Sequence, residues 1–138
     1  MHVDWHSNAG KAGFLSVRRS LLQELLKQYS EKNISNIARR VAKDTTKDIV
    51  LLLRKQYNTK SFLSVIEASI KASNYSYQHE INDTVHTFII QHDMGKKWSI
   101  YLAELYQSMI EELDANRVGY DLTANTVSFS IDEKFSLK

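Results

Sequence analysis

Imidazole side chains recur at alternate positions in the middle of the chain. His79, His86 and His92 are three of the five histidines, and a hairpin that turns at Asn82-Asp83 would place all three on one face of its strands. Three imidazoles on one face are a donor set that Zn²⁺ accepts. No carboxylate falls at a matching spacing, so we favour half-buried, hydrogen-bonded histidines among aromatic residues, and we expect no metal ion and no cofactor.

The segment FIIQHDMGKKWSIYLAEL ends an apolar run and begins a helical pattern. Lys96 and Lys97 stand at the start of the helix, where the macrodipole disfavours cations. One interpretation is that these ammonium groups, the free amides of the first turn and His92 face an anion. The alternative is that the lysines are solvated, Asp93 caps the helix and Gly95 permits a tight turn. We assign to a candidate ligand or anion site His92, Gly95, Lys96, Lys97, Trp98 and Ser99, together with His79 and His86.

Signatures of common enzyme classes are missing. The sequence has no cysteine and four glycines, which excludes thiolate chemistry and a glycine-rich phosphate loop. No nucleophile elbow, P-loop or zinc-protease motif occurs. No neighbouring residue supports Ser16 or Ser99 as a nucleophile. His2 and His6 are four residues apart, but nothing around them supports a role as metal ligands. We therefore expect a protein without enzymatic activity, and a metal-dependent enzyme ranks last among the functions considered.

Charge is unevenly divided along the chain. Residues 1–60 hold 12 Lys and Arg against 5 Asp and Glu, and residues 61–138 hold 6 against 11, so the halves carry +7 and −5. This asymmetry predicts either an anionic partner for the first half or docking between the halves. The segment SNIARRVAKDTTKDIVLLLRK looks like a helix-turn-helix, but its second helix is too apolar to face DNA. The candidate nucleic-acid patch consists of Arg18, Arg19, Arg39, Arg40 and Lys43.

Helical periodicity dominates the first seventy residues. Leucines and a tyrosine recur at helical spacing in RRSLLQELLKQYSEK, which predicts the first long helix. The run Gly13–Val17 before it is either a short strand or the lead-in to that helix. Candidate caps for three further helices are Asn33 or Ser35, Thr45 or Thr46, and Thr59 or Ser61.

Two hairpins and a helix follow. The first hairpin, with its turn at Asn82-Asp83, pairs Ile81 with Thr84, His79 with His86, Tyr77 with Phe88 and Tyr75 with Ile90. The second, with its turn at Ala124-Asn125, pairs Leu122 with Val127, Tyr120 with Phe129 and Val118 with Ile131. Between them, residues 96–114 show the apolar stripe of an amphipathic helix.

These elements predict one α+β domain over residues 1–138. A mainly helical subdomain, residues 1–73, precedes a ββαββ antiparallel sheet half, residues 74–138, whose apolar face needs helices to cover it. The N-terminus is polar and unlike a signal peptide, and the longest strongly apolar run, Ile49–Leu53, is too short to span a membrane. We expect a soluble, cytoplasmic protein that does not bind membranes.

Two stretches, VDWHSNAGKAGFLSV and QHDMGKKWSIYLAEL, resemble a domain of archaeal transcription-regulator-like proteins that follows a short ribbon-helix-helix DNA-binding segment. The positions that carry the resemblance are Trp5, Gly13, Phe14, His92, Gly95, Lys97, Trp98 and Ser99. The resemblance implies a regulatory, ligand-sensing or dimerising module of a transcription factor. No ribbon-helix-helix segment precedes Met1, so we expect any effect on DNA to be indirect.

The sequence therefore predicts a non-enzymatic regulatory module, linked to transcription regulation, that forms a homodimer and binds a small anionic ligand or a protein partner. The alternative is a nucleic-acid-binding protein that acts through its basic helical half.

Overall fold

The computed structural model of the protein describes residues 17–53, 59–112 and 117–133. The elements are α2 (Arg19–Lys27), α3 (Glu31–Leu53), α4 (Thr59–Ala72), β1 (Ser76–Asn82), β2 (Val85–Gln91), α5 (Lys96–Glu112), β3 (Arg117–Leu122) and β4 (Thr126–Asp132). This order confirms the predicted α+β class, with helices first and a ββαββ half after them. Trp5, Gly13 and Phe14, along with His2 and His6, lie outside the described residues.

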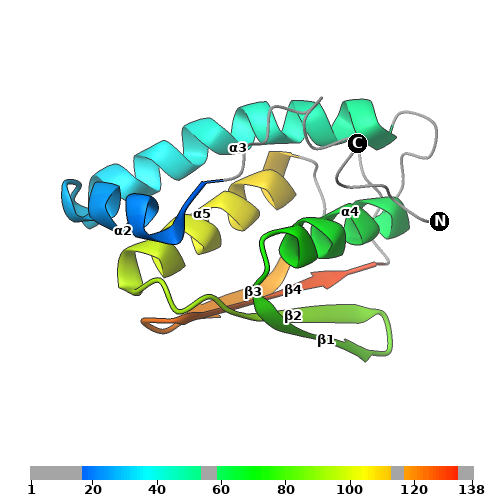
Figure 1. The fold of residues 1–138 in the computed structure, drawn as a ribbon. Coiled ribbons are helices and arrows are strands. Elements are labelled where there is room, and N and C mark those ends of the chain that lie inside the picture. Colours follow the sequence, from blue (N-terminus) through cyan, green and yellow to red (C-terminus); the bar gives the residue numbers. More distant parts are fainter. Residues whose placement is uncertain (1–16, 54–58, 113–116, 134–138) are drawn as a thin grey trace.

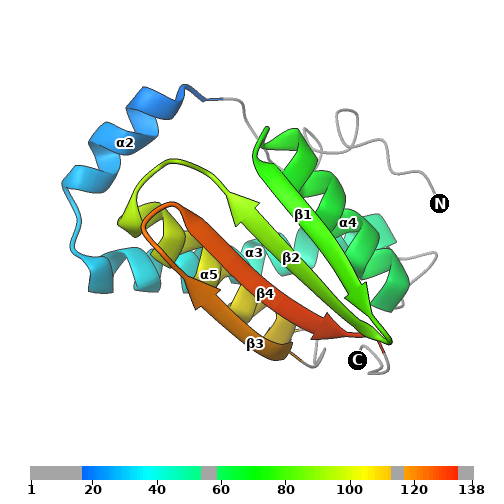
Figure 2. The same ribbon diagram turned by 90° about the horizontal axis from the view of Figure 1, so that it is seen from below.

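The described elements form three layers (Figures 1 and 2). The sheet is the lowest layer in Figure 1, α4 and α5 cover one of its faces, and α3 lies across α5 on the side away from the sheet. No helix of the described part covers the other face of the sheet, which Figure 2 shows from below. No helix in the same part of the chain is both long and apolar enough to cross a membrane.

The two hairpins join into one antiparallel sheet with the strand order β1-β2-β4-β3. The central strands β2 and β4 pair so that Phe88 lies opposite Phe129, and their rings stack with centroids 5.4 Å apart. Tyr106 of α5 stacks on Phe129 at 4.8 Å. Around these rings the core gathers Phe62, Val65, Ile66 and Ile70 from α4, Leu102, Met109 and Ile110 from α5, and Ile90, Val127 and Ile131 from the sheet.

The predicted register of the first hairpin is wrong. Its turn is Asp83-Thr84, with Asn82 paired to Val85 and His79 paired to Phe88 rather than to His86. Asp83 takes a φ of 55°, a left-handed conformation that the short polar side chain of Asp tolerates. Because the turn moves by one residue, every pair moves by two, and the same side chains still face the helices. The alternation therefore predicts the face but not the register.

The register of the second hairpin is confirmed next to its turn. Leu122 pairs with Val127 and Tyr120 with Phe129, as predicted. Farther from the turn, Ile131 pairs with Arg117 instead of Val118, because the register shifts between Arg117 and Gly119. One extra residue in β3 therefore forms a bulge, and bulges are common on edge strands such as this one.

The N-terminal half contains fewer helix breaks than predicted. One continuous helix, α3, replaces the two helices expected to start near Asn33 and Thr45. Its first turn is capped by Ser30, whose Oγ accepts the amide of Asn33 at 3.1 Å. Helix α2 ends at Lys27, earlier than the sequence pattern predicts, because Ser30 already begins the next helix. No proline or glycine interrupts α3, and its inner face buries Ile34, Ala38 and Ala42, so tertiary packing overrides the capping tendency of Thr45.

Candidate functional site

The junction between β2 and α5 is held by the turn of the second hairpin. Asp93 and Gly95 take φ values of 59° and 92°, which turn the chain sharply between strand and helix. The amide of His92 donates to the carbonyl of Asn125 at 3.0 Å, and the amide of Gly95 donates to the side-chain Oδ1 of Asn125 at 3.0 Å. The carboxylate of Asp93 accepts from the side chain of Gln91 at 3.2 Å. The carbonyl of Gly95 accepts the amides of Trp98 and Ser99 in the first turn of α5, at 3.1 and 3.2 Å.

His92 is an interior hydrogen-bonding residue of this junction. Its side chain is 2% exposed, its Nδ1 accepts the amide of Met94 at 2.9 Å, and its Nε2 lies 2.7 Å from the hydroxyl of Ser99. Ser99, fully buried, donates to the carbonyl of Ala124 at 3.2 Å. These partners require a neutral ring with its proton on Nε2. Accordingly, burial lowers the pKa of His92, against a smaller opposing effect of Asp93.

The lowered pKa of His92 predicts that acid destabilises the fold. As the pH falls below about 6.5, the ordinary value for histidine, the unfolded chain takes up a proton that the folded ring refuses. The free energy of unfolding therefore decreases as the pH decreases, by at most about 1.4 kcal/mol per pH unit for one proton. Urea unfolding of the wild type and of His92→Gln at a series of pH values measures how much His92 contributes to this pH dependence. His92→Gln should lose about 1–3 kcal/mol at neutral pH and decline less steeply in acid, and equal slopes would contradict the assignment.

The two lysines at the start of α5 tie that helix to the corner between α2 and α3. Lys97 Nζ donates to the carbonyl of Leu26 at 3.1 Å, in the last turn of α2. Lys96 Nζ lies 3.7 Å from Glu31 Oε2, in the first turn of α3. The ammonium groups therefore stand beside the negative end of another helix and beside a carboxylate, which offsets their unfavourable place at the start of their own helix. Binding of an external anion by these residues stays a prediction.

An aromatic cluster flanks the junction. Trp98 Nε1 donates to the hydroxyl of Tyr75 at 2.9 Å, and its ring stacks on Tyr101 at 4.7 Å. Tyr75 meets the ring of His92 edge-on at 6.4 Å. Burial raises the pKa of the Tyr75 and Tyr101 hydroxyls, so both stay neutral in the physiological range. Six of the predicted site residues, from His92 to Ser99, thus lie in the junction between β2 and α5. Their polar groups form hydrogen bonds mainly with other groups of the same chain.

His79 and His86 form a separate site at the other end of the first hairpin. His79 Nε2 lies 2.8 Å from His86 Nδ1. The outer nitrogens are also bonded, His79 Nδ1 to Glu67 Oε2 at 3.1 Å and His86 Nε2 to Glu133 Oε2 at 2.7 Å. We call this row of four side chains the histidine bridge. Neither glutamate is predictable from the local sequence pattern, since nothing in it links residues so far from the hairpin.

Neither histidine site has the ligands of a metal centre. Among residues 17–53, 59–112 and 117–133, no group of three or more His, Cys, Asp or Glu side chains is placed to hold a metal ion. His92, which the sequence placed on the same face as the other two histidines, bonds to Met94 and Ser99 and takes no part in the histidine bridge.

Helix α2 and the residues next to its two ends expose apolar side chains to solvent. Leu21 and Leu25 lie in the helix, Val17 precedes the extended N-cap residue Arg18, and Tyr29 follows the C-cap residue Gln28. Val17, Leu21, Leu25 and Tyr29 are spaced by four residues and are 52%, 51%, 48% and 43% exposed. We call these four side chains the α2 row. No residue of α2 is buried, and in both ribbon views the helix lies at one side of the molecule, beyond the edge of the sheet. The sequence predicts helical spacing for Leu21, Leu25 and Tyr29 and leaves Val17 in a short strand or the lead-in to the helix, and it does not indicate that the four form an interaction surface.

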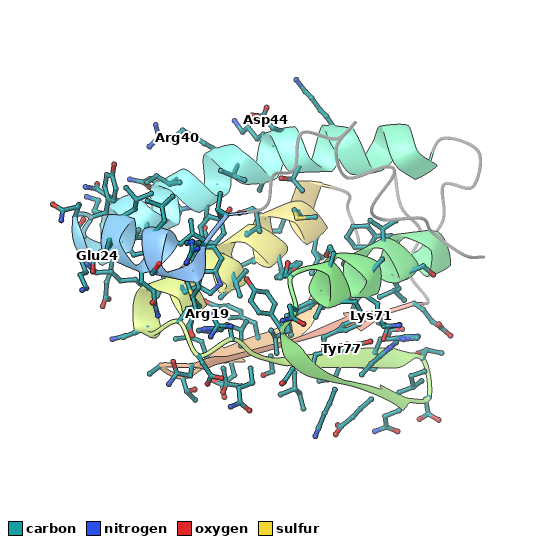
Figure 3. The ribbon with its side chains drawn as sticks, viewed as in Figure 1. Arg19, Glu24, Arg40, Asp44, Lys71 and Tyr77 are labelled. Carbon is teal, nitrogen blue, oxygen red and sulfur yellow. The ribbon has the colours of Figure 1, made fainter. Side chains whose placement is uncertain are left out.

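The predicted basic patch is divided between two helices. Arg18 and Arg19 lie at the start of α2, whereas Arg39, Arg40 and Lys43 lie on α3. Figure 3 shows Arg40 on the side of α3 that points away from the sheet. Arg39 forms an ion pair with Glu104 of α5, which is a contact between the basic and acidic halves of the kind that the charge asymmetry predicts.

A scan against protein-family models finds no match for this chain, and a search of curated proteins finds none.

Proposed function

We propose that the protein is a non-enzymatic regulatory module that forms a homodimer through the α2 row. One observation carries this proposal: a strongly amphipathic helix exposes Leu21 and Leu25, is flanked by the exposed Val17 and Tyr29, and buries none of its residues. Exposed apolar residues that stand alone are ordinary, but Leu21 and Leu25 on one face of α2, with Val17 and Tyr29 next to its two ends, form a group that marks an interaction surface. The resemblance to archaeal regulator domains supports a link to transcription regulation.

A second copy of the same chain is the partner that fits this surface. Residues four apart form a ridge along a helix, and two such ridges pack into each other's grooves. A twofold axis would bring the same row from both copies together, with Leu21 and Leu25 near its centre. The polar flanks of α2, which include Arg18, Glu24 and Lys27, would then form the rim of the interface, as in most protein interfaces.

The bonds that hold α2 do not involve the α2 row. Lys97 holds the last turn of α2 through the carbonyl of Leu26, and Lys27 pairs with Glu24 along the same helix at 2.9 Å. Neither bond involves a side chain of the α2 row. The helix is therefore anchored at its end, and its apolar row keeps facing outward.

Sedimentation velocity of the wild-type protein over a range of concentrations tests the proposal. We expect a species of about twice the 16.0 kDa of one chain, in equilibrium with the monomer on dilution. A protein that stays monomeric at every concentration would contradict it.

The second candidate function is nucleic-acid binding through α3. Five cations fall within about one third of the helix circumference at the helical repeat, and they are Lys32, Arg39, Arg40, Lys43 and Lys47. All five are exposed, and α3 is the outermost layer of the fold, with Arg40 directed outward (Figure 3). Asp44 lies at the border of this ridge and is the nearest acidic residue to it on the helix. A dimer would carry two such ridges.

Salt dependence distinguishes this second function. If the α3 ridge binds duplex DNA, the affinity falls steeply with salt, and Arg40→Ala with Lys43→Ala reduces the slope of log K against log salt by about two. Fluorescence anisotropy with labelled duplex at several salt concentrations gives the slope. Lys71→Ala, an exposed lysine of α4, is the control and should leave the slope unchanged. Absence of binding even at low salt would rule out the second function.

A further inference from the structure

The histidine bridge joins four segments that are far apart in the sequence. Glu67 comes from α4, His79 from β1, His86 from β2 and Glu133 from the residue after β4. Three hydrogen bonds of 3.1, 2.8 and 2.7 Å connect them in one row. The four side chains are only 11–37% exposed, so these bonds are partly shielded from water.

The bridge needs more protons than neutral histidines supply. A neutral imidazole carries one N–H, and an ionised carboxylate only accepts. When both rings direct their N–H groups at the two glutamates, His79 Nε2 and His86 Nδ1 face each other at 2.8 Å with a lone pair on each. Such a contact is repulsive without a positive charge between the atoms. Three hydrogen bonds require three protons, one more than the two neutral rings hold.

We propose that His79 and His86 bind one additional proton as a pair, shared between their rings and balanced by Glu67 and Glu133. The bridge is complete in this singly charged state. A second additional proton would place N–H groups on both facing nitrogens and break the central bond, so the pair accepts one proton where two separate histidines would accept two. The site makes the joining of α4 to both hairpins dependent on pH.

The surroundings favour a positive charge at this place. The ring of His79 stacks on Phe88 with centroids 4.3 Å apart, and an aromatic face attracts a cation. Among the side chains that the structure describes, the other charged groups on these segments are Lys71, one turn beyond Glu67 on α4, Asp83 in the hairpin turn, and Glu80 and Asp132, which strand alternation places on the opposite face of the sheet. The two glutamates of the bridge are thus the carboxylates bonded to the pair.

The separation of the two nitrogens fits a proton better than a metal ion. Ligands held at 2.0–2.1 Å in a tetrahedral zinc site lie about 3.3 Å from each other. The facing nitrogens are 2.8 Å apart, which is the length of an ordinary hydrogen bond to nitrogen.

Nitrogen-15 NMR of the histidine side chains tests the proposal on the whole chain. Between about pH 8 and pH 5, where histidines ordinarily titrate, we expect His79 and His86 together to take up one proton, in a single step that both rings report. Uptake of two protons, or of none, over this range would overturn the proposal.

Carboxamide variants test the role of the glutamates. Glu67→Gln and Glu133→Gln each remove a balancing charge, so the proton should be taken up at a lower pH than in the wild type. Glu80→Gln, a matched change on β1 with its side chain on the opposite face, should leave the titration where it is. An equal shift in the pH of proton uptake in all three variants would show that the bridge has no specific role and would overturn the proposal.

Discussion

Replacing Phe129 by Ala should lower the free energy of unfolding by about 3–5 kcal/mol. Phe129 is 2% exposed in the middle of β4, where its ring stacks on Phe88 of the neighbouring strand and on Tyr106 of α5. The substitution removes the side chain that joins the sheet to its main covering helix, and the cavity cannot close without moving both. Urea unfolding followed by circular dichroism measures the loss.

Ser128→Ala is the matched control for this prediction. Ser128 precedes Phe129 on the same strand and faces the side of the sheet that no described helix covers. Its replacement should change stability by no more than about 0.5 kcal/mol. Similar losses from both variants would show that the sheet does not bury one face only.

Replacing Leu21 and Leu25 by Ser should abolish association of the chain at concentrations where the wild type is a dimer. Burying one leucine is worth about 1.5–3 kcal/mol, and the twofold axis counts each substitution twice. The association constant should therefore fall by more than about a hundredfold. The single chain should lose only about 1–2 kcal/mol of stability per substitution, because both leucines are about half exposed in it. Sedimentation velocity and urea unfolding of the same samples provide the two readings.

Ile81→Ser is the matched control for the leucine variant. Ile81 is 63% exposed at the end of β1 and lies outside the α2 row, so its replacement removes a similar exposed apolar side chain without touching the proposed interface. We expect it to dimerise like the wild type. A leucine variant that sediments as a dimer would locate the interface elsewhere.

Much of the fold follows from local patterns in the sequence. The alternation in both hairpins predicts which side chains face the helices, and Ala124-Asn125 sets the second register next to its turn. The first register is not predictable in this way, because turns at Asn82-Asp83 and at Asp83-Thr84 bury the same face. The continuity of α3 likewise depends on packing against α5, which no property of Thr45 or Thr46 indicates.

The candidate sites were predictable only in part. The spacing from His92 to Ser99 correctly indicates one compact junction, whereas its hydrogen bonds to Ala124 and Asn125 depend on the tertiary fold. Glu67 and Glu133 reach the histidines only after α4 and β4 have packed on the first hairpin. The α2 row shows the same periodicity whether its own core or a partner covers it, so the sequence alone does not distinguish the two.

Hydrogen–deuterium exchange of the wild-type protein at low and high concentration tests the dimer most directly. Since α2 buries no residue within one chain, its amides should exchange rapidly when the protein is dilute and become protected when it is concentrated. Peptides from α5, which is covered by α3 and the sheet in the single chain, should show no such dependence. Exchange from α2 that is the same at every concentration would contradict the proposal that this helix is the surface through which the protein associates.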